Sequence, residues 1–264
     1  MTKHIAAIST LAVSAILLAL PANAAFAQDV TAVADRLKAL VEKQGMSISW
    51  SNITGDVSTM TLEGVTVKQP GETDALPIGN LTLSDVTEKD GGFRVGTLAT
   101  APFSMADQGF ALDVSPFVFG GLSLPAEAST DPMAGLMMYE SAALDNLSVK
   151  MAGKTVFSLQ NATGNMSPAD GSGPLTFSGG VEKFTADLTA VEDANVKGYI
   201  QALGYSQLDG NVRMEGSWQP SDGHWDMPKY DITVNDVGSL GMTLDLGGLT
   251  PELLKKVNEL STKA

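Results

Sequence analysis

The chain has 264 residues, no cysteine, and 30 acidic against 16 basic residues, which gives a formal net charge of −14 at pH 7. It contains only three arginines and no basic cluster, so it lacks the positive charge that a phosphate backbone requires, and nucleic acid is excluded as a main partner. Without disulfides, burial and sheet hydrogen bonding must hold the fold together.

Residues 1–27 have the pattern of a bacterial secretory signal peptide. Lys3 precedes an apolar run over residues 5–20, and a proline and small residues follow up to Ala27. The run is near the lower limit for crossing a bilayer, and no charge cluster follows it, so we predict cleavage after Ala27 rather than a retained anchor. We therefore expect a periplasmic or secreted protein with no transmembrane segment after cleavage.

The next predicted element is an amphipathic helix over residues 28–45. Its apolar residues recur at helical spacing, and Gly45 provides a C-cap. The stripe consists of Val30, Val33, Ala34, Leu37, Leu40 and Val41. A single stripe predicts that one face of this helix packs against the rest of the protein.

Residues 46–249 are predicted to form a β domain, because the apolar period changes from helical to two. Met46, Ile48 and Trp50 alternate with serines, and Gly64 interrupts a later alternating run, which indicates a bulge. Short alternating runs separated by Gly, Asp, Asn and Pro continue almost to the end of the chain. They predict a mainly β fold with a curved antiparallel sheet, built as a half-open barrel or groove.

Helical patterns interrupt and end this β domain. Two short helical insertions are predicted, near residues 131–144 and near residues 191–204. The first begins with Asp131 and Pro132, a favourable N-cap and first-turn pair. A C-terminal helix is predicted over residues 250–264. We expect the two amphipathic terminal helices to cap the sheet.

A weak internal repeat and a family resemblance accompany this plan. The stretches "LEGVTVKQPG", "IGNLTLSDV" and "LDNLSVKMAG" share an apolar residue, a small or acidic pair and an alternating strand. A helix ending in glycine, followed by "ITGDVSTMTLEGVTVKQPG" and "LPIGNLTLSDV", resembles the opening of AsmA-like and YdgA-like bacterial envelope proteins. Residues 203–249 are similar to the C-terminal strands of such chains. The resemblance implies a half-open β groove with an apolar interior and a link to lipid handling.

The stretch "GSWQPSDGHWDM", residues 216–227, contains two of the three tryptophans, one of the two histidines and two aspartates. After signal removal His224 is the only histidine, so a zinc site with two histidines cannot form, and no G-x-S-x-G motif presents a serine. The alternating flanks predict a hairpin in which Trp218 and Trp225 face each other. The acidic turns do not fit a calcium loop, and turn chemistry explains them better than calcium binding. We therefore predict no catalytic residue, no metal and no cofactor.

Apolar surface is the remaining candidate for a site. A methionine-rich stretch follows an aromatic strand, and methionine adapts to irregular apolar partners. The candidate residues for a hydrophobic groove or lid are Phe117, Phe119, Met133, Leu136, Met137 and Met138. They are predicted either to cover an acyl-chain groove or, as the alternative, to plug the end of the sheet as core residues.

These features favour a noncatalytic envelope protein that binds a hydrophobic or lipid-like molecule. The first alternative is a structural or protein-interaction protein of the envelope, with another envelope protein as its partner and no ligand. The second is an exported carboxylate-dependent hydrolase, because 30 acidic residues leave room for a catalytic pair.

Overall fold

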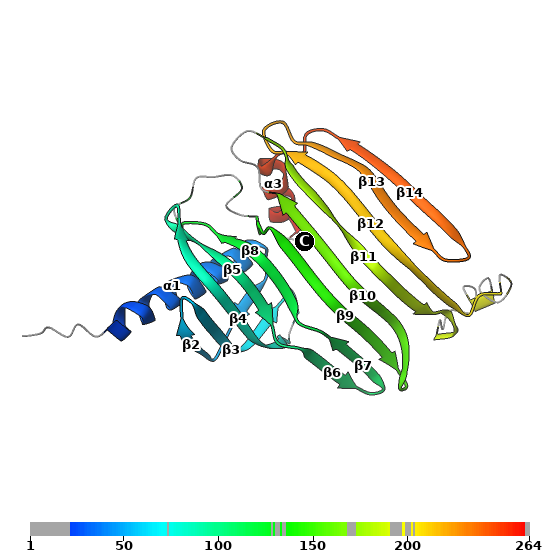
Figure 1. Cartoon of the computed structure of the whole chain (residues 1–264), viewed down its shortest axis with the longest axis horizontal. Helices are drawn as coiled ribbons and strands as arrows, with labels where there is room; N and C mark the ends of the chain where they lie inside the picture. Colours follow the sequence, from blue (N-terminus) through cyan, green and yellow to red (C-terminus); the bar gives the residue numbers. More distant parts are fainter. Residues whose placement is uncertain are drawn as a thin grey trace, which may run out of the picture.

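The computed structural model describes residues 22–261, apart from residues 73, 128, 130–132, 134–135, 168–172, 191–196, 199–201 and 203. Most of this part of the chain is strand (Figure 1). The elements are α1 (Ala22–Lys43), β1 (Ser47–Ser49), β2 (Asn52–Asp56), β3 (Thr59–Lys68), β4 (Leu76–Lys89), β5 (Gly92–Thr100), β6 (Phe103–Asp107), β7 (Phe110–Val114), β8 (Phe117–Leu124), β9 (Ser141–Met151), β10 (Lys154–Ser167), β11 (Leu175–Asp187), the 3-10 turn η2 (Leu188–Ala190), β12 (Gln207–Gln219), β13 (His224–Val234), β14 (Gly238–Leu246) and α3 (Pro251–Ser261).

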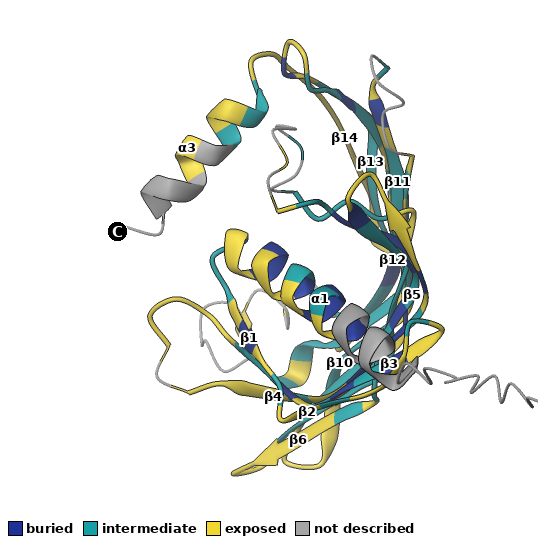
Figure 2. Cartoon of the chain, turned by 90° about the vertical axis from the view of Figure 1, so that its left-hand side faces the viewer, coloured by how far each residue is buried: buried dark blue, intermediate teal, exposed yellow. Residues whose placement is uncertain are grey.

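The strands form one antiparallel sheet that curves but does not close, which confirms the predicted mainly β fold. Its order is β1-β3-β4-β5-β8-β9-β10-β11-β12-β13-β14, so nearly every strand lies beside its neighbour in sequence. The β6–β7 hairpin adds to the far end of β9, next to the stretch that pairs with β8. Figure 2 shows the curvature, with α1 inside the bend and α3 on the same, concave side.

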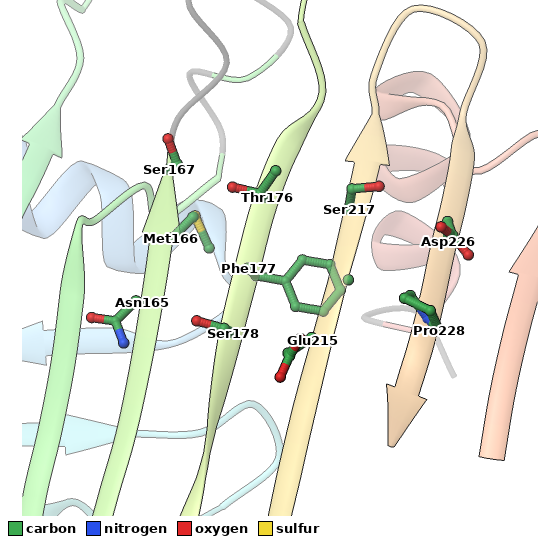
Figure 3. A pocket seen from close by; sticks show the side chains of 11 residues that line it. Asn165, Met166, Ser167, Thr176, Phe177, Ser178, Glu215, Ser217, Asp226 and Pro228 are labelled. Carbon is green, nitrogen blue, oxygen red and sulfur yellow. The ribbon is translucent and has the colours of Figure 1, made fainter. Parts of the chain in front are cut away.

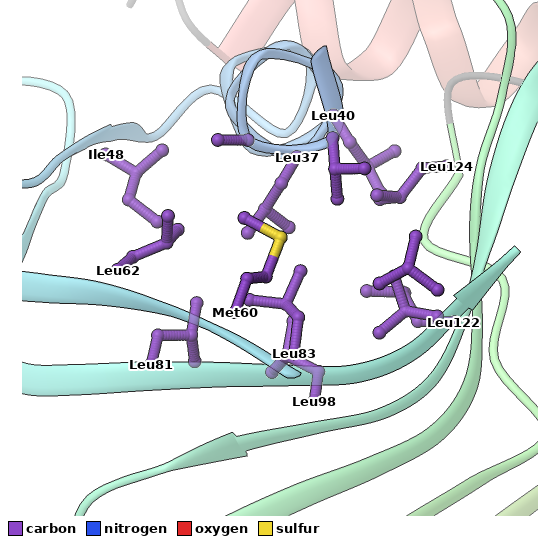
Figure 4. Packing of buried hydrophobic residues seen from close by; sticks show 14 of the residues in the cluster. Leu37, Leu40, Ile48, Met60, Leu62, Leu81, Leu83, Leu98, Leu122 and Leu124 are labelled. Atoms are coloured by element: carbon purple, nitrogen blue, oxygen red, sulfur yellow. The ribbon is translucent and has the colours of Figure 1, made fainter. Parts of the chain in front are cut away.

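The main core lies between α1 and the strands at the N-terminal end of the sheet. All six residues of the predicted apolar stripe are buried, and they meet buried residues from β1, β3, β4, β5 and β8 (Figure 4). Val33 and Ala34 have no exposed surface, and neither do Met60, Leu62 and Leu83 across the interface. We call α1 with β1 to β5 and β8 the covered region, and β9 to β14 the open region.

Single left-handed residues reset the alternation of the strands. Leu83 and Val86 are both buried on the core side of β4, although they are three positions apart, because Asp85 between them has a φ of 54°. Asp85 is left out of the ladder with β5, where Ser84 and Val86 are paired. Such a residue re-aims the following side chains, and so keeps the apolar residues on one face of a bending strand.

Left-handed residues also occur in other strands, and two of them coincide with the weak repeat in the sequence. Gly64, Gly121 and Asn161 have φ values of 60°, 66° and 51° and occupy corresponding places in β3, β8 and β10. Gly64 lies between the buried Leu62 and Val65, at the predicted bulge, where the β3–β4 register shifts. Gly64 and Gly79 are left-handed in two of the repeated stretches, whereas Gly121 and Asn161 lie outside all three.

The predicted helical insertion near residues 131–144 is wrong in its second half. Ser141–Leu144 are the first residues of β9 and pair with β8. Just before them, the N–H of Ser123 in β8 donates to the carbonyl of Met138 at 2.8 Å, so this connection also runs along the sheet. Strand pairing outweighs the helix propensity of the alanines and methionines here, because a local preference is weak against many sheet hydrogen bonds.

Several other predictions fall wholly or partly outside the described residues. Residues 1–21 of the predicted signal peptide lie outside them, and α1 begins at Ala22 and runs across the predicted cleavage site at Ala27. Most of the predicted insertion near residues 191–204 also lies outside them. Among the helices that the structure does describe, none combines the length and apolar character needed to cross a membrane.

Candidate functional site

The predicted groove or lid residues lie at the junction of the covered and open regions. Phe119 and Met137 pack against the core under α1, and Phe119 also contacts Tyr139 with ring centroids 5.1 Å apart. Phe117 meets Phe119 edge-on at 4.7 Å. The backbone of Met138 is tied to β8, and Met133 and Leu136 are half-buried. This packing of Phe119 and Met137 is what a plug at the end of the core requires, and it leaves them little freedom to act as a lid.

The stretch around His224 forms the predicted hairpin. Trp218 at the end of β12 pairs with Trp225 at the start of β13, as predicted, and Trp225 contacts the ring of Phe177 at 5.2 Å. The Nε2 atom of His224 lies 2.9 Å from the Oδ1 atom of Asp245 in β14. The hydrogen bond with Asp245 raises the pKa of His224 above its usual value, and desolvation acts in the opposite direction.

A serine lies in the same turn as this histidine. The hydroxyl of Ser221, in the same turn, accepts a hydrogen bond from Gln219 Nε2 at 2.8 Å. The described residues also contain no group of three or more histidine and acidic side chains that could hold a metal ion. The contact between His224 and Asp245 joins the start of β13 to the end of β14.

The open region has one continuous apolar face. Residues that pair directly in antiparallel strands point to the same side of the sheet. In the register, Val181 of β11 is paired with Val212 of β12, Val212 with Ile232 of β13, and Ile232 with Leu240 of β14. The face so defined, here called the open face, is formed by Leu147, Val149, Phe157, Leu159, Phe177, Val181, Phe184, Val212, Met214, Trp225, Tyr230, Ile232, Leu240, Met242, Leu244 and Leu246.

The open face continues the apolar side on which α1 packs. Phe119, which belongs to the core side of β8, pairs with Ala142 of β9, and its neighbour Phe117 pairs with Leu144. The open face therefore lies on the concave side, in continuity with the core (Figure 2).

Most of this face is not buried by any described element. On the apolar side of β10 to β14, the buried large apolar residues among those described are Leu175, Trp218 and Met227. All three lie at the end of the sheet from which α3 departs, where Trp218 Nε1 donates to the carbonyl of Leu249 at 2.8 Å. The side chains on β14 are the most accessible, and Leu240 keeps 57% of its surface exposed. An uncovered apolar face of this extent marks an interaction or ligand site.

The opposite face of the open region is polar. Positions between the apolar ones carry serine, threonine, asparagine and charged residues, and they interact across the strands. Lys229 Nζ donates to Glu215 Oε1 at 2.8 Å, and Ser158 and Thr185 share a hydrogen bond of 2.6 Å. The sheet is therefore two-sided, with one face suited to water and the other suited to apolar partners.

One hollow in the described structure draws its lining mainly from polar positions. It has a volume of about 720 Å³ and opens widely to solvent between β10 and β13 (Figure 3). Asn165, Ser178 and Glu215 lie across from one another in successive strands, with Asp226 nearby in the lining. Glu215 is already engaged by Lys229, and the hollow is not enclosed, so it does not build the dry carboxylate pair that glycoside hydrolysis uses.

The helix α3 carries further exposed apolar residues on the concave side. Thr250 caps its first turn, accepting a hydrogen bond from the N–H of Leu253 at 3.3 Å. Leu253 and Val257 are exposed, with 42% and 55% of their surface accessible. Figures 1 and 2 place α3 on the same side of the sheet as α1, at the end of the open region. The helix thus presents apolar side chains on the side where the open face lies.

Comparisons with protein-family models, with curated proteins and with solved structures found no match to this chain. The geometry of the open face is therefore the basis for the functional assignment.

Proposed function

We propose that the protein is a noncatalytic binder of a hydrophobic, acyl-chain-bearing molecule, which it holds on the open face. The observation that carries this proposal is the continuous apolar surface of β9 to β14 on the concave side of a curved sheet, most of which no described element buries. Burial of apolar surface is favourable by roughly 25 cal/mol per Å², so a chain lying along this trough gains binding energy from many small contacts.

The chemistry of the face favours an apolar chain over a polar ligand. Its rows supply aliphatic, methionine and aromatic side chains, while the charged groups of the same strands point to the other side. A ligand held on this face makes apolar contacts and forms no ion pair with it. The proposed ligand class is therefore a lipid recognised through its acyl chains, with its head group at the rim.

The proposed setting follows from the sequence. A signal peptide over residues 1–27, a periplasmic or secreted location and a resemblance to AsmA-like envelope proteins are consistent with exposure of the chain to membrane lipids. The strongly acidic composition keeps such a binder soluble and away from anionic membrane surfaces. Capping of the sheet by the two terminal helices belongs to the same proposal, because α1 and α3 both lie on the concave side of the sheet.

The proposal is tested by extracting the purified protein with organic solvent, identifying bound lipid by mass spectrometry, and titrating the delipidated protein with a fluorescent fatty acid. We expect copurified lipid and saturable binding. The informative variant is Ile232→Glu, which places a charge in the middle of the open face. Loss of one well-packed side chain costs about 1.4 kcal/mol or more, so probe affinity should fall about tenfold or more.

Thr233→Glu is the matched control. It adds the same charge at the next position of the same strand, but on the polar face, where Thr233 bonds to Ser239. We expect it to bind the probe as the unmodified protein does, with both variants folded by circular dichroism. A protein that is free of lipid and does not bind the probe would refute the proposal, and so would equal loss of binding in both variants.

A further inference from the structure

The strand β14 is an unprotected sheet edge. Among the described strands it pairs only with β13, so one side of its backbone offers free N–H and C=O groups. All nine of its residues are exposed. Natural edge strands are shielded by proline, lysine or a bulge. β14 contains neither proline nor lysine, and the extra residue in its ladder with β13 belongs to β13, between Met227 and Tyr230.

Like the unpaired backbone groups, the apolar side chains of β14 are exposed to solvent. Leu240, Met242, Leu244 and Leu246 alternate along one face, and each keeps between 40% and 57% of its surface exposed. The opposite face has one glycine, two small hydroxyl residues and a single charge, Asp245. A regular edge with an apolar stripe and almost no charge is a template for another strand.

We propose that β14 is the dimer interface of this protein, and that the strand pairs antiparallel with β14 of a second copy about a two-fold axis at Met242. Met242 is the midpoint of Gly238–Leu246, so this register pairs the strand along its whole length. Leu240 then opposes Leu244 of the second copy on the apolar face, and Ser239 opposes Asp245 of the second copy on the polar face.

Charge placement favours this arrangement. In the antiparallel register the only charged residue of the strand meets a hydroxyl, which can donate a hydrogen bond to it. A parallel pairing in register would set Asp245 directly against Asp245 of the second copy, and like charges in direct opposition destabilise a sheet. A second copy is thus complementary to this edge in backbone, in apolar pattern and in charge.

The two-fold axis is perpendicular to the sheet, so both copies keep their apolar faces on the same side. Two curved sheets then join into one wider sheet, and the exposed stripe on β14 moves from the rim to the centre. A dimer of this kind is isologous and closed, and it consumes both free edges at once. The proposed dimer requires no ligand, so it can be tested independently of lipid binding.

Cysteine mapping tests the proposal directly, because the chain has no cysteine of its own. Directly opposed residues in an antiparallel pair have Cα atoms about 4.5–5.5 Å apart, within the range that a disulfide spans. Met242→Cys should therefore give a disulfide-linked dimer in high yield under mild oxidation at low micromolar concentration. Met151→Cys is the control, because Met151 is also exposed, at 49% against 41% for Met242, but lies on β9. It should remain largely uncrosslinked.

The register is tested by mixing two variants. Leu240→Cys mixed with Leu244→Cys should crosslink more efficiently than either variant alone, since those two positions oppose each other. Light scattering of the unmodified protein should give twice the mass of one chain. Met242→Lys should give the mass of a single chain with the fold retained, whereas Thr243→Lys, on the polar face, should remain dimeric.

Three outcomes would overturn the proposal: a single-chain mass for the unmodified protein at high concentration, crosslinking of Met242→Cys no better than that of Met151→Cys, or a stable dimer of Met242→Lys. If β14 instead pairs with a strand of another protein, the purified chain should also have a single-chain mass. Observation of the dimer would therefore exclude a different protein as the partner of β14.

Discussion

The covered and open regions of the sheet have the same alternating strand pattern, but their apolar side chains are buried to different extents. In the covered region, apolar residues on the concave side meet the stripe of α1 and are buried, as Leu83 and Val95 are. In the open region, the same alternation places Val212 and Ile232 on the same side, but only half-buried. The difference teaches that alternation decides which face a side chain occupies, whereas burial requires a second layer. A sheet face without that layer is available for binding.

The largest expected effect comes from placing a charge in each region. Val33→Asp in α1 puts an unpaired carboxylate at a position with no exposed surface, and should lower the free energy of unfolding by about 3 kcal/mol or more. Val212→Asp makes the same change on the open face, where water can solvate the charge, and should cost about 1 kcal/mol or less. Urea denaturation followed by circular dichroism measures both. Similar losses would mean that the open face is buried in solution.

Truncation of leucine sharpens the same contrast. Leu83→Ala removes a fully buried side chain and should destabilise the protein by about 2–5 kcal/mol, through lost transfer energy and the cavity left behind. Leu240→Ala, at an exposed position on β14, should change stability by about 0.5 kcal/mol or less in the absence of dimerisation. Thermal unfolding at a concentration where the chain is monomeric provides the measurement. A large loss for Leu240→Ala there would contradict the assignment of β14 as a free edge.

Left-handed residues allow a comparison of the backbone in the two regions. Asp85→Ala forces an alanine to adopt a φ of 54° and should cost about 1–2 kcal/mol, while Asp85→Gly should be close to neutral. Asn161, with a φ of 51°, is the counterpart in the open region, and its alanine variant also loses the hydrogen bond to Glu182. Chemical denaturation of the alanine and glycine pairs should give the same sign at both sites. An alanine variant as stable as the glycine variant would show that the phase reset does not require the left-handed conformation.

The smallest expected effect is a pH dependence at the end of the open region. The hydrogen bond to Asp245 raises the pKa of His224 in the folded protein above its ordinary value of 6.5. The stabilisation from this contact is therefore complete below pH 6.5 and is lost as the pH rises through the folded-state pKa. His224→Ala should be less stable than the unmodified protein near pH 5.5 and nearly equal to it near pH 9. A stability difference that does not change with pH would exclude the charged contact.

The sequence was sufficient for the parts of the fold that local pattern controls. The stripe of α1, the cross-strand pair of Trp218 and Trp225 and the bulge at Gly64 all follow from spacing and turn chemistry. Residues 141–144 were assigned wrongly, because strand pairing with β8 cannot be read from the helix propensity of the segment itself.

The candidate site was harder to predict for a related reason. Each strand of the open region contributes only a few apolar residues, and these join into one face only when the register is known. Local richness in Met and Phe pointed instead to Phe119 and Met137, which pack against the core. The signal that could have located the open face is the shift in apolar phase at Asn161, read together with the matching shift at Gly64.

The left-handed residues also help to fix the register between neighbouring strands. Asp85 of β4 and Gly121 of β8 both lie opposite Gly96 of β5, so the three form one row across the sheet. If the register between any two of these strands shifted by one residue, a left-handed residue would lie opposite a regularly paired residue. Apolar side chains would then turn toward water. Two-sided sheets with little side-chain locking are prone to such slips. Asn161, which is left out of the ladders of β10 with β9 and with β11, is the corresponding irregularity in the open region, and it restricts the alignment of strands that no helix covers.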